Sequence, residues 1–324
     1  MTTQSMWSVE GPQKLTFDEP VADLRVRIIG GTVNVVAAED GPARLEVTEI
    51  DGPPLQIVQD GATLTVSYED FPFNGAQSFS SWLESKPWKQ WSASGRRKAW
   101  ERSAVVTLTV PAATRVQLAT VSAVSFVSGI AGATDVTGVS GDTTLVGLTG
   151  PVKAHTVSGG VEAQGVTGEF AFHSVSGALT VVDGAGTRVR ADSVSGDMLL
   201  DLGAGPAADA GNAADTDTGN DTDAGPRAAR PVDIALTSVS GQVAIRLPHP
   251  ADARVEANTA SGGISNAFED LRVSGQMGAK RITGTLGAGT GTLRATTVSG
   301  AIALLRRPRD PEDAAPLSLD KKVL

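Results

Sequence analysis

Residues 139–177 read VSGDTTLVGLTGPVKAHTVSGGVEAQGVTGEFAFHSVSG, and this stretch decides the fold. The serines of its three Val-Ser-Gly triplets, Ser140, Ser158 and Ser176, follow one another at intervals of 18 residues. A second glycine turn lies half-way through each interval, at Gly150 and Gly168. The unit is therefore 18 residues long with two halves of nine, and such a fixed period is typical of stacked repeat architectures.

The same unit extends in both directions. From the Val-Ser-Ala triplet at Ser122 to Ser195 the serine spacings are 18, 18, 18 and 19 residues, and the register returns at Ser240, Ser261 and Ser299. We attribute the 45-residue gap before Ser240 to an insertion and the 38-residue gap before Ser299 to about two further units.

Apolar residues alternate with polar ones on both sides of each triplet, which indicates short strands separated by glycine corners. The columns six and four residues before the serine face inward in this interpretation, as do those three and five residues after it. They contain Val116, Val152, Phe170, Val189, Ile234, Val255, Leu293; Leu118, Ala154, Phe172, Ala191, Leu236, Ala257, Ala295; Val161, Leu179, Met198, Val243, Ile264, Ile302; and Ala163, Val181, Leu200, Ile245, Leu304.

These patterns predict an all-β fold, a parallel β-solenoid (β-helix-like) whose 18-residue coils stack about 4.8 Å apart. A column of hydroxyls two residues before the serine also faces inward, and we interpret it as structural because buried hydroxyls need partners. It contains Thr120, Thr156, Ser174, Ser193, Ser238, Thr259 and Thr297. A flatter sandwich of short antiparallel strands is the alternative, although antiparallel pairing does not require an 18-residue translation.

Composition excludes several classes of protein. The 324 residues include 37 Gly, 17 Pro and no Cys, which disfavours a helical bundle and excludes disulfides, thiolate metal sites and a cysteine nucleophile. A net charge of −9 argues against nonspecific binding to nucleic acid. Neither a secretory signal nor an apolar run of about 20 residues is visible, so we expect a cytoplasmic protein.

The repeated triplets, together with the run from Leu24 to Val35 (LRVRIIGGTVNV), resemble a bacterial β-strand-repeat family. That family is catalogued as domain of unknown function 4097 and also labelled "putative adhesin". The resemblance covers residues 20–70 and 104–305. It implies a β-solenoid-like domain without established enzymatic activity, sometimes attached to envelope or stress-response proteins, and it transfers no functional residues.

The pattern divides the chain into six segments. They are N-terminal β coils (1–73), a Trp/basic insertion (74–103), regular 18-residue repeats (104–202), an acidic loop (203–231), C-terminal repeats (232–305) and a tail (306–324). The acidic loop is expected to be a disordered linker, because its hydrophobic content is essentially alanine. Its Asp215–Asp223 run invites a calcium interpretation but lacks the glycine and terminal glutamate positions of an EF-hand loop.

The Trp/basic insertion holds four of the five tryptophans and has a net charge of +4, against −13 for the remainder of the chain. Tryptophan interleaved with cations suits a protein partner, because tryptophan and arginine dominate binding hot spots. It also suits an anionic membrane surface, and a third interpretation is a cap that covers the solenoid. The candidate docking residues are Trp82, Trp88, Lys89, Trp91, Arg96, Arg97, Lys98 and Trp100.

His155, His173 and Asp192 occupy one outward column on successive coils, a spacing that could hold a divalent metal. The column continues as Thr237, Asn258 and Thr296, ordinary residues for an exposed strand, so we assign no metal site and no cofactor.

Asp142 and Asp197 share a column but lie three coils apart, too far for a paired acid and base. No nucleophile elbow or phosphate loop is present either. We therefore expect no enzyme.

The sequence predicts a non-catalytic β-solenoid scaffold, adhesin-like, that docks a protein partner through the Trp/basic insertion. A membrane-peripheral envelope-stress component is the first alternative and a carbohydrate-active β-helix enzyme the second. The exposed strand edges at the two ends also allow end-to-end self-association unless they are capped.

Overall fold

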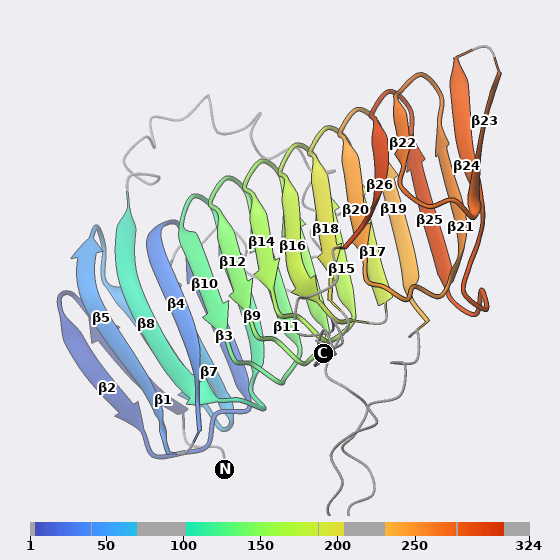
Figure 1. Ribbon diagram of the computed structural model, residues 1–324. Coiled ribbons are helices and arrows are strands. Elements are labelled where there is room, and N and C mark those ends of the chain that lie inside the picture. The colour runs from blue at the N-terminus through green and yellow to red at the C-terminus, as the bar shows by residue number, and fades with distance from the viewer. Residues whose placement is uncertain are drawn as a thin grey trace, which may run out of the picture.

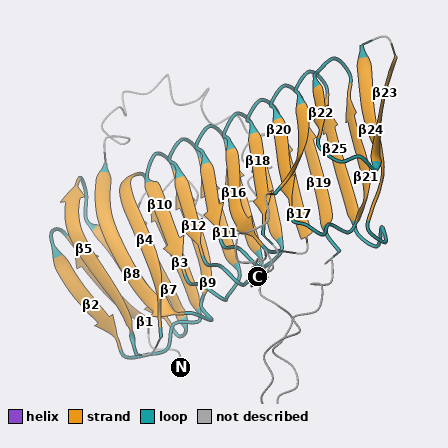
Figure 2. Cartoon of the chain, viewed as in Figure 1, coloured by secondary structure: helices purple, strands orange, loops and turns teal. Residues whose placement is uncertain are grey.

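The structure, a computed structural model, describes residues 4–39, 41–69, 102–186, 188–203, 231–276 and 278–307. Within these ranges the chain is all-β, with 26 strands and no helix. Two large sheets lie face to face and form one elongated, two-layered body (Figure 1). Figure 2 shows how short loops connect the strands of one sheet to those of the other.

The larger sheet has 14 strands. In spatial order they are β1 (Gln4–Val9), β6 (Leu55–Asp60), β7 (Thr63–Tyr68), β3 (Asp23–Ile28), β9 (Arg115–Thr120), β11 (Thr134–Gly138), β13 (Val152–Thr156), β15 (Phe170–Ser174), β17 (Arg188–Ser193), β19 (Asp233–Ser238), β25 (Thr292–Thr297), β21 (Ala253–Thr259), β24 (Ala279–Leu286) and β23 (Leu271–Gln276).

The smaller sheet has 12 strands. In spatial order they are β2 (Gln13–Phe17), β5 (Ala43–Asp51), β8 (Ser103–Pro111), β4 (Gly30–Ala38), β10 (Val124–Ser128), β12 (Thr143–Val146), β14 (Val161–Gln164), β16 (Leu179–Gly184), β18 (Met198–Leu202), β20 (Val243–Leu247), β26 (Ile302–Arg306) and β22 (Ile264–Asn266).

In the middle of the body the chain alternates between the sheets, and each strand pairs in parallel with the equivalent strand of the next unit. Val116 pairs with Thr134, Thr134 with Val152 and Val152 with Phe170, each a step of 18 residues. The predicted parallel pairing is therefore confirmed here, and antiparallel pairing is confined to the two ends. Both sheets are open: their described terminal strands do not pair with each other.

The core between the sheets is made of the predicted inward columns. All of those residues are buried except Ile264, which is half-buried on the three-residue strand β22. Because side chains alternate across a strand, the intervening residues lie on the two outer faces. The largest buried apolar side chains of this middle region are Phe170 and Phe172, which fill the layer between β15 and the facing sheet.

The Val-Ser-Gly corners hold neighbouring coils together. In each corner the serine amide and hydroxyl both donate to the carbonyl oxygen of the valine in the adjacent coil, at 2.8–2.9 Å and 3.1–3.3 Å respectively. The glycine that follows is required for close approach rather than for positive φ. A Cβ at Gly196, for example, would lie 2.0 Å from the carbonyl oxygen of Gly177.

The inward hydroxyl column is only partly satisfied. Ser174, Ser193, Ser238 and Thr259 each accept a hydrogen bond from the amide of the corner glycine three residues later, at 2.7–2.9 Å. Thr297 instead donates to the carbonyl oxygen of Gly300 at 2.6 Å. The buried hydroxyls of Thr120 and Thr156 have no hydrogen-bond partner among the described residues. The structural interpretation thus holds at five of the seven positions.

Antiparallel strands cap the N-terminal end of the body. In the 14-stranded sheet β3 pairs in parallel with β9 on one side and with β7 on the other. In the 12-stranded sheet β4 pairs in parallel with β10 on one side and with β8 on the other. Beyond β7 and β8 lie β6 and β5, followed by β1 and β2, all antiparallel to their neighbours. The ring of Trp7 packs edge-on against Phe17 at 5.5 Å and closes this end of the core.

The order of the coils at the C-terminal end differs from the sequence prediction. The 38-residue gap before Ser299 does not contain two further coils. It contains the antiparallel hairpin of β23 and β24, after which β25 and β26 return to lie between the coil of β19 and β20 and the coil of β21 and β22. The hairpin thus occupies the end of the 14-stranded sheet, and the last coil lies inside it.

Candidate functional site

The predicted docking residues Trp82 to Trp100 lie outside the described residues. Their point of attachment is described: the segment leaves the body after β7 and re-enters it at β8. Tyr68 at the end of β7 is buried, and the guanidinium of Arg102 lies 5.7 Å from the centre of its ring. Burial of the Tyr68 hydroxyl raises its pKa to about 12.

The acidic loop also lies almost entirely outside the described residues, and its flanks lie at the opposite edge of the body. The chain leaves the 12-stranded sheet after β18 and enters the 14-stranded sheet at β19. The repeat continues across it without a change of register, because Val189 pairs with Ile234 and Met198 with Val243. The strands on either side of the loop therefore belong to one continuous repeat.

The structure brings the predicted histidine column together on the outer face of the 14-stranded sheet. His155 on β13 pairs with His173 on β15, and His173 pairs with Asp192 on β17. The two imidazole rings stack with centroids 5.1 Å apart, and His173 Nδ1 lies 3.3 Å from Asp192 Oδ2. Thr137 on β11 pairs with His155 on its other side.

Burial is the main cause that lowers the pKa of His155, and the adjacent His173 and Lys153 lower it further, while Asp135 acts in the opposite direction. The three side chains form a row along one flat face and do not surround a point. Over the described ranges, no group of three or more His, Asp or Glu side chains is arranged to hold a metal ion.

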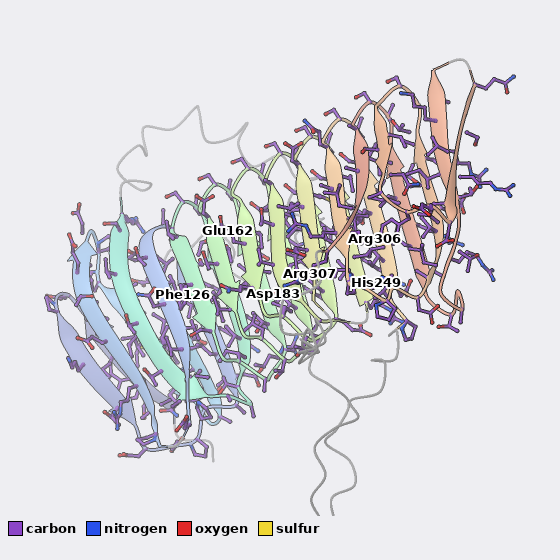
Figure 3. The ribbon with its side chains drawn as sticks, viewed as in Figure 1. Phe126, Glu162, Asp183, His249, Arg306 and Arg307 are labelled. Atoms are coloured by element: carbon purple, nitrogen blue, oxygen red, sulfur yellow. The ribbon has the colours of Figure 1, made fainter. Side chains whose placement is uncertain are left out.

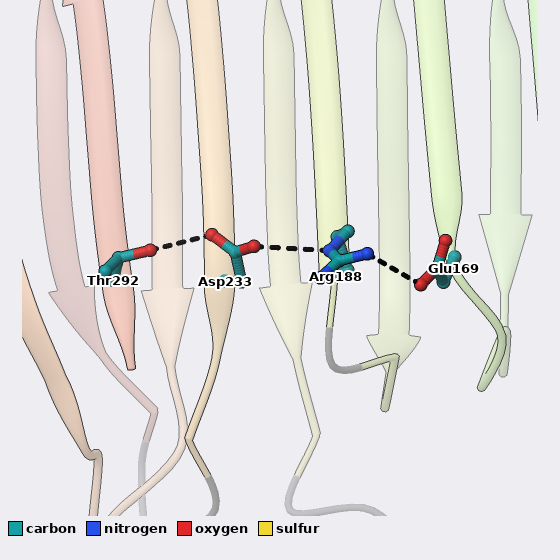
Figure 4. A network of polar contacts seen from close by, with 4 residues as sticks. All are labelled: Glu169, Arg188, Asp233 and Thr292. Atoms are coloured by element: carbon teal, nitrogen blue, oxygen red, sulfur yellow. Dashed lines mark hydrogen bonds and ion pairs between the residues drawn. The ribbon is translucent and has the colours of Figure 1, made fainter. Parts of the chain in front are cut away.

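A second polar row crosses the start of four strands of the same sheet (Figure 4). Arg188 donates to Glu169 Oε1 at 2.9 Å and to Asp233 Oδ2 at 3.2 Å, and Thr292 donates to Asp233 Oδ1 at 2.7 Å. The hydrogen bond from the Thr292 hydroxyl is the main cause that holds the pKa of Asp233 below its ordinary value, and Arg188 lowers it further. All four residues lie seven positions before a corner serine, a column that the sequence analysis did not use.

Sequence reasoning also missed a cluster at the edge from which the acidic loop departs. Arg307 donates to Asp183 Oδ1 at 2.6 Å and lies 3.6 Å from Asp201 Oδ1, and Arg246 pairs with Asp201 Oδ2 at 3.0 Å. Arg307 lies 124 positions after Asp183, so spacing gives no signal for this contact. Figure 3 shows Asp183 and Arg307 close together on this part of the body.

Asp142 and Asp197 act as structural acceptors at their corners. Asp142 Oδ1 accepts a hydrogen bond of 2.8 Å from the Gly160 amide, and Asp197 Oδ1 accepts one of 2.7 Å from the Gln242 amide. Each carboxylate therefore bridges its own coil to the next one. Two such acceptors do not form the facing carboxylate pair that glycoside hydrolysis requires.

The fold and these surface rows define an all-β repeat protein with two open, mostly parallel sheets. No family model matches the chain, and no curated protein matches it. Membership of the family of domain of unknown function 4097 therefore stays a prediction.

Three solved structures are similar along almost the whole chain. A "putative adhesin" from Bacteroides fragilis shares 12% identity over 94% of this chain and 97% of its own, with a TM-score of 0.43. One from Parabacteroides distasonis shares 11% over 94% and 98%, with a TM-score of 0.41. A "putative cell adhesion protein" from Clostridium sporogenes shares 10% over 91% and 100%, with a TM-score of 0.24.

The described ranges contain no helix with the length and hydrophobicity needed to cross a bilayer.

Proposed function

We propose that the chain is a non-catalytic, adhesin-like scaffold, a β-solenoid whose body presents the Trp/basic insertion to a protein partner. One observation carries this proposal. Both strands that flank the insertion are interior strands: β7 is paired with β3 and β6, and β8 with β4 and β5. The sheets thus hold in place the two strands between which the insertion leaves and re-enters the body.

The outer faces support a binding role over a catalytic one. Their polar side chains are engaged in rows of contacts along the sheet, such as Glu169, Arg188 and Asp233. Such rows stabilise a flat surface, whereas catalysis needs side chains that converge on a reacting atom. The names of the three similar structures agree with an adhesive role but belong to those proteins.

The test compares the intact chain with two variants. One carries Trp82→Ala, Trp88→Ala and Trp91→Ala, and the other has residues 74–103 replaced by a short Gly-Ser linker. We expect one specific protein to be recovered from native lysate by the intact chain and lost with both variants, at an unchanged melting temperature. If the melting temperature falls instead and no partner is lost, the insertion is a cap and the docking proposal fails.

The same variants decide the first alternative, a membrane-peripheral role. The tryptophans and the net charge of +4 in residues 74–103 favour binding to anionic headgroups. In that case the intact chain floats with vesicles that contain anionic lipid, the binding weakens with salt, and the triple-alanine variant stays in the aqueous fraction. Flotation without any protein partner would replace the docking proposal with this one.

A further inference from the structure

The two ends of the 14-stranded sheet are strands with few features that prevent further pairing. At one end lies β1, at the other β23, and each is six residues long. Their twelve residues include one charged side chain, Arg272, and no proline. No described strand pairs with the outer edge of either. An edge strand presents unpaired backbone N–H and C=O groups, so it can pair with a strand of another chain. Natural edge strands are normally protected by charged side chains, proline or short length, and these two have little such protection.

Both edge strands run in the direction of the parallel strands of the body. At the N-terminal end β1 is antiparallel to β6, and β6 is antiparallel to β7, which is parallel to β3. At the C-terminal end β23 is antiparallel to β24, and β24 is antiparallel to β21, which is parallel to β25. A second copy that is translated along the body, without being turned over, therefore brings β1 beside β23 in parallel orientation.

The C-terminal end has an uncovered apolar position. Val273 on β23 pairs with Ile282 on β24, which is completely buried, so Val273 lies on the inner side of the sheet. It is nevertheless 53% exposed. The reason is that the 12-stranded sheet stops at β22, while the 14-stranded sheet continues through β24 to β23. Val273 thus faces inward with no described strand opposite.

The N-terminal end supplies a matching side chain. Trp7 on β1 faces inward, where its ring packs against Phe17, and it is only partly buried. Side-chain alternation restricts the joint sheet to registers in which inward residues of β1 lie beside inward residues of β23. Among these, Trp7 beside Val273, with Ser5 beside Leu271 and Val9 beside Gly275, places the largest inward side chain of β1 next to the exposed Val273.

The charges of the two ends are complementary. Residues 4–20 and 41–62, which form the N-terminal cap, carry seven acidic and two basic side chains, a formal charge of −5. The segment 267–286 at the other end carries three basic and two acidic side chains, a formal charge of +1, and its Arg281 forms an ion pair with Glu256 of β21. Two copies of the N-terminal end therefore repel each other, whereas the N-terminal and C-terminal ends attract weakly.

We propose that the chain associates head to tail with further copies of itself, with β1 of one copy pairing in parallel with β23 of the next. The contact buries Val273 under Trp7 and continues the 14-stranded sheet from copy to copy. Because the two surfaces differ and the copies are related by translation, the contact does not close into a ring and produces linear filaments.

The test uses the full chain without a tag at its N-terminus, in sedimentation velocity over a range of concentrations. We expect the sedimentation coefficient of the unmodified chain to rise with concentration and this rise to weaken with salt. Val273→Lys places a charge at the edge and should keep the chain monomeric. The matched control is Val298→Lys, because Val298 is 52% exposed but lies at a corner within the stack of coils; it should associate like the unmodified chain.

A mixing experiment tests the head-to-tail arrangement itself. Ser5→Lys blocks the β1 end, and a chain that lacks residues 1–6 is the second variant for that end should Ser5→Lys lower the melting temperature. Each blocked chain alone should be monomeric, while an equimolar mixture with Val273→Lys should form dimers that grow no further. An unmodified chain that stays monomeric overturns the proposal. Self-association of the Ser5→Lys chain also overturns it, since this would indicate pairing between two β23 strands. Loss of association in Val298→Lys as complete as in Val273→Lys overturns it too.

Discussion

The hydroxyl of Ser299 donates a hydrogen bond of 3.3 Å to the carbonyl oxygen of Val239, 60 residues earlier in the chain. Ser261 is nearer to Ser299 in sequence, but its hydroxyl donates to the carbonyl oxygen of Val298 at 3.2 Å. The last coil is thus enclosed by two coils that precede it. Its removal would separate the hairpin end of the body from the regular repeats.

This order of coils can be tested with engineered disulfides, because the chain has no cysteine of its own. Thr237 on β19 pairs directly with Thr296 on β25, and Thr296 pairs with Asn258 on β21. We expect Thr237→Cys with Thr296→Cys to form a disulfide on mild oxidation. Thr237→Cys with Asn258→Cys should stay reduced, because β25 separates these positions by about 9–10 Å, beyond the reach of a disulfide.

The measurement is the free-thiol content after oxidation, with mass spectrometry of peptides to locate the bond. Asn258→Cys with Thr296→Cys is the control pair, and it should also cross-link. A disulfide between positions 237 and 258 in the monomer would mean that the coils stack in sequence order and that the return of β25 is wrong.

The sequence predicts the repeat well because the glycine corners and the apolar columns are local. Gly141, Gly196 and Gly300 are required by close contacts with the carbonyl of a neighbouring coil, and each corner repeats the same requirement. The order of neighbours at the C-terminal end is different in kind. The units around Ser240, Ser261 and Ser299 have equivalent apolar columns, so the pattern cannot determine which two of them are adjacent.

The direction of the terminal strands cannot be predicted from the sequence either, because side chains alternate with a period of two in antiparallel and parallel strands alike. The strands β5 and β6 alternate like those of the coils, yet both run antiparallel to their neighbours. On the surface, the His155, His173 and Asp192 row was predictable because it lies within the regular 18- and 19-residue spacing. The Arg307 contact with Asp183 was not, because 124 positions separate the two residues and the spacing of the repeat gives no signal for this pair.

Corner glycines should be intolerant of any side chain. A Cβ at Gly196 would meet the Gly177 carbonyl oxygen at 2.0 Å, so Gly196→Ala must push two coils apart. We expect a loss of about 1–3 kcal/mol or more in the free energy of unfolding, the usual range for overpacking. The measurement is urea denaturation.

Gly11 provides the matched control for this substitution. A Cβ at Gly11 would have no atom within 4 Å, and the residue has no positive φ, so Gly11→Ala should leave stability unchanged or raise it slightly. Equal losses from the two variants would show that close approach at the corners is not what selects glycine there.

Within the inward hydroxyl column, we expect one substitution to lower the stability of the protein and another to leave it unchanged or raise it. Ser238 is buried and accepts a hydrogen bond of 2.9 Å from the Gly241 amide, so Ser238→Ala leaves that amide without its partner. We expect a loss of about 1–3 kcal/mol. Thr156 is also buried, but its hydroxyl has no partner among the described residues, so Thr156→Val should be neutral or stabilising.

Thermal unfolding of both variants in parallel is sufficient, because the two positions lie in equivalent sites of different coils. If Thr156→Val destabilises the protein as strongly as Ser238→Ala, the Thr156 hydroxyl has a partner and the contrast within the column disappears.

The lowered pKa of His155 predicts a stability change at mildly acidic pH. Its folded pKa lies below the ordinary value of 6.5, because the ring is half-buried and faces His173 and Lys153, with Asp135 only partly offsetting them. The unfolded chain therefore binds a proton at a higher pH than the folded chain does. Stability is complete above pH 6.5 and falls as the pH drops from there through the folded pKa of His155.

We expect the free energy of unfolding to be lower at pH 5 than at pH 7.5, and His155→Thr to reduce this difference. Threonine suits the position because Thr137 occupies the same column on the neighbouring strand. His173→Thr is the second variant: it removes one repelling charge, so the pKa of His155 rises toward 6.5 and the pH dependence becomes weaker without vanishing. Urea denaturation at several pH values between 5 and 7.5 measures this. A pH dependence that is the same in His155→Thr as in the unmodified chain would assign the acid sensitivity to other groups, because the His155 ring would then titrate alike in the folded and unfolded chain.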